Sequence, residues 1–83
     1  MVRTADKATG IVIRRLRKNA GVTQQAIAGF IGVSYQQMQK YEKGTNRLSI
    51  SSLFDICKGL EVKPHTVVRL IEHEYQNQKD ILS

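Results

Sequence analysis

The chain lacks several features that define common classes of protein. It has one cysteine, Cys57, among 83 residues, so an internal disulfide is excluded. No stretch approaches the ~20 consecutive apolar residues of a membrane-spanning helix, and the first ten residues lack the apolar core of a secretion signal. With an ordinary apolar content of 41%, these absences predict a cytoplasmic protein, folded as a single domain over residues 1–83.

Residues suited to catalysis or metal binding are also scarce. His65 and His73 are eight positions apart, and Cys57 or Glu72 is the candidate for a third metal ligand. No CxxC or HxxxH spacing occurs, and neither a glycine-rich phosphate loop nor a Ser-His-Asp pattern is recognisable. We therefore expect no enzymatic activity, no metal and no cofactor, and we expect Cys57 to be a small core residue.

Acidic residues are nearly absent from one half of the chain. Residues 1–47 contain nine Lys or Arg and two Asp or Glu, which gives a net charge of +7. Residues 48–83 contain four Lys or Arg and five Asp or Glu, which gives a net charge of −1. This asymmetry suggests that the first half binds a polyanionic partner. The alternative is that the positive charge serves only to keep the protein soluble.

Glycine, proline and capping residues divide the chain into five predicted helices and no strand. Apolar residues recur three or four positions apart, as Ile27 and Ile31 do, which is a helical spacing. The predicted helices cover about residues 4–19, 24–31, 35–43, 50–58 and 64 to beyond 75, with 72–83 a C-terminal helical extension. The expected caps are Thr4 or Asp6, Thr23, Ser34 and Ser49, the expected stops are Gly21, Gly32, Gly44 and Gly59, and Pro64 opens the last helix.

Residues 24–43 form the most specific pattern, two short helices joined by a turn of about three residues. Ala28 is small enough to lie where two steeply crossed helices touch, and Gly32 can adopt the positive φ that the reversal needs. The positions expected to face a shared core are all apolar: Ile27, Ile31, Val33, Met38 and Tyr41. This combination is typical of a helix-turn-helix.

Over about residues 13–67 the sequence resembles the phage repressor and Cro family, also called XRE-type helix-turn-helix regulators. The resemblance rests on LRKNAGVTQQAIAGFIGVS, on the following segment that ends in YEKG, and on LSISSLFDICKGLEVKP. It implies an all-α, compact five-helix, lambda-repressor-like DNA-binding domain with the helix-turn-helix at its second and third helices. It also implies a bacterial transcriptional regulator that pairs on palindromic operators. Gly29 and Phe30 depart from the polar residues usual in the second helix.

The free side of residues 35–43 carries amides and amines. Steps of 100° per residue place Met38 and Tyr41 on the buried side and Gln36, Lys40 and Lys43 opposite. Glutamine can bond adenine twice and lysine can donate to guanine O6 and N7, although any solvated helix face is polar. The predicted base-contacting residues are Tyr35, Gln36, Gln37 and Lys40, with Gln39 on the flank, and they occupy positions where the family contacts bases. Tyr35 could instead contact a phosphate or pack on Phe30.

Other residues are expected to contact the DNA backbone or to hold the fold. By resemblance, Gln24 binds a phosphate, aided by the dipole of its helix, and Arg17 and Glu42 form a partly buried ion pair. The expected phosphate-contacting residues are Gln24, Ser34, Lys43, Thr45, Asn46 and Arg47, although 45–46 are equally consistent with a simple turn. Arg14, Arg15 and Lys18 are left for solvent or for the DNA backbone.

The sequence therefore predicts a sequence-specific repressor that binds double-stranded DNA as a homodimer, with no membrane partner and no small-molecule effector. One short recognition helix offers few base contacts, and two copies double them. The expected dimer surface draws on Val68, Ile71, Tyr75, Ile81 and Leu82, whereas Val67 and Leu70 are expected in the core. The alternative is a protein-interaction module of the same fold that has lost specific DNA binding.

Overall fold

Five α-helices follow one another along the chain in a computed structural model that describes the backbone of residues 3–82 and the side chains of residues 3–78. No strand occurs among residues 3–82, and the all-α prediction is confirmed. The helices are α1 (Thr4–Asn19), α2 (Gln24–Ile31), α3 (Tyr35–Lys43), α4 (Ile50–Leu60) and α5 (Pro64–Leu82).

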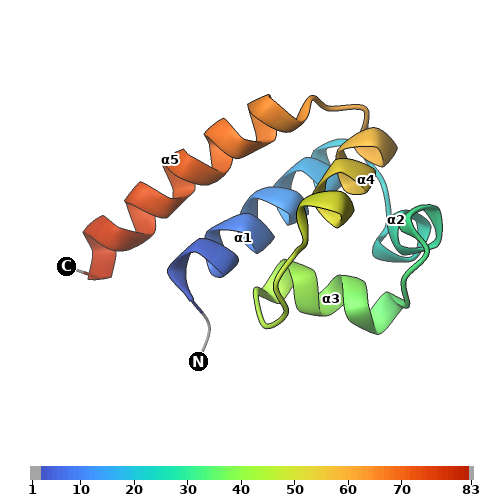
Figure 1. The fold of residues 1–83 in the computed structure, drawn as a ribbon, viewed down its shortest axis with the longest axis horizontal. Helices are drawn as coiled ribbons and strands as arrows, with labels where there is room; N and C mark the ends of the chain where they lie inside the picture. Colours follow the sequence, from blue (N-terminus) through green and yellow to red (C-terminus); the bar gives the residue numbers. More distant parts are fainter. Residues whose placement is uncertain (1–2, 83) are drawn as a thin grey trace.

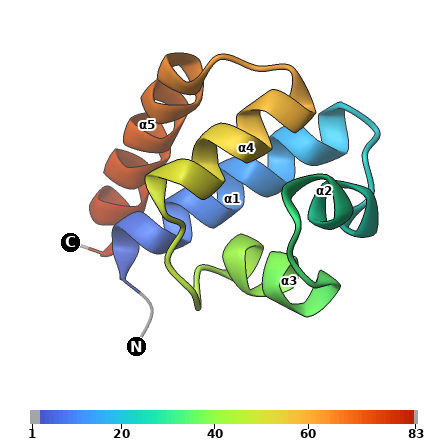
Figure 2. The same cartoon turned by 45° about the vertical axis from the view of Figure 1, so that its right-hand side comes forward.

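Helix α1 runs through the middle of the molecule and organises the others. It packs against α3 on one side and against α5 on the other, while α2 packs against α3 and α4. Helix α5 returns antiparallel to α1, so its last turn lies at the end where α1 begins (Figures 1 and 2). The paired helices α2 and α3 are thereby left at one side of the molecule, with their outer surfaces away from α5 (Figure 2).

The core draws its largest side chains from every helix. Ile13, Ile27, Met38, Ile56 and Val67, one from each helix in turn, all have relative exposures below 2%. Burying a side chain of this size stabilises the fold by about 1.5–3 kcal/mol. The core prediction for the lone cysteine is also confirmed, since Cys57 is buried and its burial raises the pKa of the thiol.

Three of the four predicted N-terminal caps are present. The hydroxyls of Thr23, Ser34 and Ser49 each accept a hydrogen bond, at 3.0 Å, from the backbone N–H three residues later. The first helix is different, because Arg3 occupies the capping position and makes no side-chain cap. The Arg3 carbonyl already accepts from the Lys7 N–H at 2.9 Å. The prediction of a cap at Thr4 or Asp6 is therefore wrong, since both residues lie inside the helix.

Helix α4 does not stop at its glycine. Gly59 lies within the helix, which continues to Leu60 and ends where Glu61 adopts a left-handed conformation with φ of 57°. A Cβ on residue 59 would lie 2.6 Å from Ile27 Cδ1 and 2.8 Å from Phe30 Cδ1. The prediction of Gly59 as a stop is therefore wrong, because this glycine serves the close approach of α2 to α4.

The buried stripe of α5 is rotated from the predicted one. Val67 is 1% exposed as expected, but Leu70 is 36% exposed, and Ile71 packs against the core instead. The inward positions are Val67, Ile71 and Glu74, spaced four and three residues apart, which is one continuous helical face. The assignment of Leu70 to the core is therefore wrong.

Candidate nucleic-acid interface

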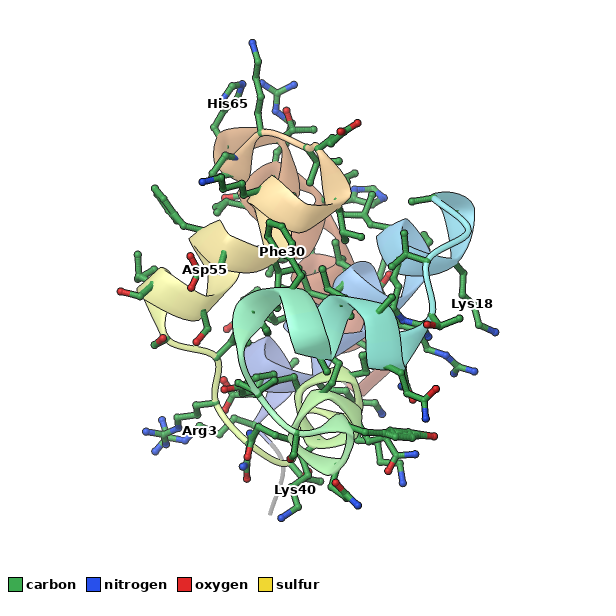
Figure 3. The ribbon with its side chains drawn as sticks, turned by 90° about the vertical axis from the view of Figure 1, so that its right-hand side faces the viewer. Arg3, Lys18, Phe30, Lys40, Asp55 and His65 are labelled. Atoms are coloured by element: carbon green, nitrogen blue, oxygen red, sulfur yellow. The ribbon has the colours of Figure 1, made fainter. Side chains whose placement is uncertain are left out.

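Helix α3 buries one side and exposes the other. Met38 is buried and Tyr41 half-buried, whereas Gln36, Lys40 and Lys43 are exposed, as the helical spacing predicts. Glu42 is buried as well. Lys40 extends from the edge of the molecule, on the far side of α3 from α4 (Figure 3). The four predicted base-contacting residues lie on this helix, three of them exposed and Gln37 half-buried.

The N-terminus of α3 is open to an anion. The Ser34 Oγ accepts from the Gln37 N–H at 3.0 Å, and the first turn of the helix contains no acidic residue. The positive end of the helix dipole is therefore not offset by a carboxylate of its own turn, which favours an approaching phosphate. The Ser34 hydroxyl still has its own proton to donate.

The predicted ion pair between α1 and α3 is present in the structure. Arg17 Nε lies 2.6 Å from Glu42 Oε2, and Arg17 Nη2 lies 3.1 Å from Glu42 Oε1. The guanidinium also donates from Nη1 to the Val22 carbonyl at 2.8 Å. Both side chains are at least nine-tenths buried. The carboxylate of the recognition helix is thus turned inward and paired, away from the face that carries the amides and amines.

Gln24 makes a contact that the sequence did not reveal. Its Nε2 donates to Glu42 Oε1 at 2.8 Å, so the residue expected to grip a phosphate is tied to the buried ion pair. One proton of the amide is used in this bond and the second is available to another acceptor. Only the resemblance-based pairing of Glu42 offered a signal, because a carboxylate oxygen that accepts from arginine can accept a second hydrogen bond.

A hollow of about 330 Å³ lies between α1, α2 and α3 beside this cluster. Its lining includes the cations Arg14 and Lys43, both exposed, together with the ion pair and the amides of Gln24 and Gln39. The lining therefore has more positive than negative side chains and suits an anion. Arg14, left unassigned by the sequence, lies within reach of any phosphate that enters.

Two pairs of polar side chains on and beside α3 are bonded to each other. Gln39 Nε2 donates to the Tyr35 hydroxyl at 2.9 Å, one helical turn apart. Asn46 Nδ2 donates to Gln37 Oε1 at 3.2 Å across the end of the helix. The Tyr35 hydroxyl is therefore held against the surface of α3 by the Gln39 side chain.

The remaining loop residues expected at phosphates also have partners within the protein. The Thr45 hydroxyl donates to the Lys40 carbonyl at 3.3 Å, which is the contact of a helix-ending turn. Arg47 Nε lies 3.6 Å from Asp6 Oδ2, with 68% of the Arg47 side chain exposed. An exposed pair of this kind is weak, so a phosphate can replace the Asp6 carboxylate.

Gly10 is a scaffold residue that sequence reasoning missed. A Cβ at this position would lie 2.7 Å from the Tyr41 carbonyl oxygen and closer still to that of Glu42. Helix α1 therefore approaches the last turn of α3 backbone to backbone. Its only signal in the sequence was a glycine inside a helical pattern, which is unfavourable unless close packing requires it.

The predicted dimer surface is divided in the structure. Val68 is 50% exposed, whereas Ile71 and Tyr75 are half-buried, and Ile71 packs against the core. The side chains of Ile81 and Leu82 lie outside those that the structure describes. Helix α4 adds two exposed apolar residues that the sequence analysis did not select, Ile50 at 70% and Phe54 at 54%.

The fold and this interface define a helix-turn-helix domain. The family described as Helix-turn-helix matches residues 13–67, and the chain belongs to this XRE-type family. It is 47% identical over 57 residues to an uncharacterised transcriptional regulator in the ATPase CF(0) region of Rhodospirillum rubrum. That match covers 69% of this chain and 53% of the relative, so the chain spans about half the length of this curated relative.

Solved structures of gene regulators share the fold. The clp gene regulator ClgR from Corynebacterium glutamicum superposes with a TM-score of 0.88 over 92% of this chain and 81% of its own, at 24% identity. The wild-type restriction-modification controller protein C.Esp1396I superposes with a TM-score of 0.79 over 88% of this chain and 95% of its own, at 26% identity. The family to which the chain belongs is one of transcription regulators, which are not enzymes.

The described residues offer neither a metal-binding cluster nor a membrane-spanning helix. No group of three or more His, Cys, Asp or Glu side chains is placed there to hold a metal ion. No helix in the described part of the chain is long and apolar enough to cross a membrane.

Proposed function

We propose that the chain is a sequence-specific regulator of transcription that inserts α3 into the major groove of double-stranded DNA. The observation that carries this proposal is the inward pairing of Glu42, the only carboxylate on α3. The outer face of the helix is left with hydroxyl, amide and ammonium groups, which suit base edges and do not repel phosphates.

The proposed contacts fall into two groups with different consequences. The base-contacting residues are Tyr35, Gln36, Gln37 and Lys40. Backbone contacts come from Gln24, Ser34 and Lys43, from Thr45 and Arg47 of the following loop, and from Arg14, whose guanidinium borders the same hollow as Gln24 and Lys43. The first group selects a sequence and the second sets affinity and register.

The regulator is proposed to act as a homodimer on a palindromic operator, and as a repressor that excludes other proteins from the site. A single α3 spans only nine residues, so one copy offers few base contacts. Two copies would place their recognition helices in half-sites about one turn apart, ~34 Å. The pairing surface is proposed on the outer side of α5 around Val68, with Ile50 and Phe54 of α4 adding apolar area. The regulator would work in the cytoplasm, where its operator lies.

Selection from a pool of random double-stranded sequences tests this function directly. The purified chain should enrich a motif with two-fold symmetry, and its affinity should fall steeply with salt because bound counterions are released. An asymmetric motif would contradict the homodimer and leave the DNA contact intact. No enriched motif, with weak and salt-insensitive binding, would favour the protein-interaction module instead.

A further inference from the structure

Gln37 is the base-contacting residue most firmly held within the protein. Its backbone N–H donates to the Ser34 hydroxyl at 3.0 Å, and its side-chain carbonyl accepts from Asn46 Nδ2 at 3.2 Å. The side chain is half-buried, whereas Gln36 and Lys40 are exposed. A half-buried polar side chain whose carbonyl already accepts a hydrogen bond has lost part of its conformational freedom before any ligand arrives.

Asn46 belongs to a loop that is itself fixed. The N–H groups of Thr45 and Asn46 both donate to the Lys40 carbonyl, at 3.0 and 3.4 Å, which holds the loop over the last turn of α3. Gly44 has a φ of 75° and lies so close to α1 that a Cβ there would be 2.8 Å from Lys7 Cα. Asn46 therefore contacts Gln37 from a backbone whose position α1 and α3 determine together.

The direction of the hydrogen bond between the two amides has a chemical consequence. Because the Gln37 carbonyl accepts from Asn46, the Gln37 amide group keeps both of its protons for other partners. In the major groove, guanine O6 and N7 and thymine O4 are acceptors, whereas the cytosine edge offers a donor. A glutamine held in this way is complementary to an acceptor.

We propose that Asn46 is a positioning residue that sets Gln37 as a hydrogen-bond donor and so determines the base preference at one position of the operator. This inference rests on the proposed DNA-binding function. It replaces the expectation that Asn46 contacts a phosphate, because its amide donates to a base-contacting side chain. Gln37 then prefers guanine or thymine over cytosine at its contact.

The test compares binding of five variants with that of the wild-type chain, on the selected operator and on operators changed one base pair at a time. Gln37→Ala identifies the base pair that Gln37 contacts. Asn46→Ala should reduce discrimination at that same base pair by roughly fivefold or more, the lower range for one base-edge contact. In the double variant, Asn46→Ala should cause no further loss of discrimination at that base pair beyond the loss caused by Gln37→Ala. The salt dependence of binding by Asn46→Ala should stay as in the wild type.

Asn46→Asp gives a second and opposite readout. A carboxylate at residue 46 accepts from the Gln37 amide group and turns its carbonyl outward, so the preference should shift towards a base edge that offers a donor. Thr45→Ala is the matched control, since it changes the neighbouring loop residue, whose hydroxyl contacts only the Lys40 carbonyl. Base preference should be unchanged in that variant, and any loss of its proposed phosphate contact should weaken binding equally on all sequences.

Three results would overturn the inference. The first is an Asn46→Ala variant that binds all sequences equally more weakly and has a salt slope lower by about one, as the loss of a phosphate contact does. The second is an Asn46→Ala variant with unchanged base preference, and the third is an Asn46→Asp variant that retains the wild-type preference. Ratios between sites do not depend on the folded fraction of a variant. If the wild-type chain selects no motif, the proposed function fails together with the inference, whereas a wild-type motif that Asn46→Ala leaves intact overturns the inference alone.

Discussion

Gln24 Nε2 donates a hydrogen bond to the buried Glu42 Oε1 over 2.8 Å, which ties the start of α2 to the last turn of α3. The same Glu42 oxygen accepts from Arg17, so three helices meet at one carboxylate. The residue expected to grip the DNA backbone is therefore part of the scaffold that orients the recognition helix. The proposed contact of Gln24 with the DNA backbone would be coupled to the orientation of α3 through this bond.

The free energy of unfolding should be sensitive to the charge of residue 24, which it would not be at an isolated surface position. A carboxylate beside Glu42 removes the hydrogen bond and adds like-charge repulsion, so Gln24→Glu should lower the free energy of unfolding by more than Gln24→Ala. The alanine variant should lose about 0.5–1.5 kcal/mol, as for one hydrogen bond. Urea denaturation at pH 7 measures both. Equal stability of the glutamate variant and the wild type would contradict the contact.

Truncation of Gln36 and truncation of Lys43 should affect DNA binding in different ways. Gln36→Ala should relax the preference at one base pair, at a cost of about 1–3 kcal/mol on the cognate site. Lys43→Ala should weaken binding about equally on all sequences and lower the salt slope by about one. Titrations on cognate and mutated operators at two salt concentrations measure both effects. A uniform loss in Gln36→Ala would remove this residue from the base-contacting group.

Two glycines inside helices should respond oppositely to the same change. Gly10→Ala places a Cβ against the carbonyl oxygens of Tyr41 and Glu42, so it should destabilise the fold by about 1–3 kcal/mol through overpacking. Gly29→Ala is the matched control, because nothing lies within 4 Å of its added Cβ. That change should stabilise the fold by about 0.5–1 kcal/mol. Thermal melts of both variants give the comparison, and a stabilised Gly10→Ala variant would contradict the close packing of α1 on α3.

Glu74 should make the attachment of α5 sensitive to acid. Hydrogen bonds from Gln78 (2.9 Å) and from Arg15 (3.1 Å) hold the pKa of the Glu74 carboxyl below its usual value. Because the folded-state pKa lies below the unfolded one, this stabilisation is complete above the unfolded value of about 4.3. It is lost as the pH falls through the folded value.

The advantage of the wild type over Glu74→Gln in unfolding free energy should therefore be largest near neutral pH and should shrink below about pH 4. Denaturation curves between pH 3 and 7, in steps of about one unit, would measure it. Glu72→Gln is the control, since Glu72 is exposed two residues away. A difference between wild type and Glu74→Gln that stays constant with pH would contradict this role of the carboxylate.

Much of the architecture follows from local chemistry. The hydroxyls of Thr23, Ser34 and Ser49 cap their helices as the sequence predicts, because a cap bonds within three residues of its own position. Gly32 and Gly44 end helices with positive φ for the same local reason. The helix-turn-helix could thus be located to the residue, and its amide-bearing face could be assigned from a 100° step.

Two of the three errors arose where distant segments meet. Gly59 carries the same local signal as the glycines that end helices, yet it lies within α4, because Ile27 and Phe30 of α2 occupy the space that a side chain would need. Leu70 and Ile71 are both apolar and adjacent, and only the packing of α5 on α1 and α4 decides which one is covered.

The sequence by itself determined the five helices, the turn between α2 and α3 and the chemistry of the exposed side of α3, since each depends on residues within a few positions of one another. Tertiary structure alone decided that Gln24 shares Glu42 with Arg17 and that Asn46 contacts Gln37. These contacts join residues 18 and 9 positions apart, and they form only because core packing brings the helix ends and the loop into hydrogen-bonding distance.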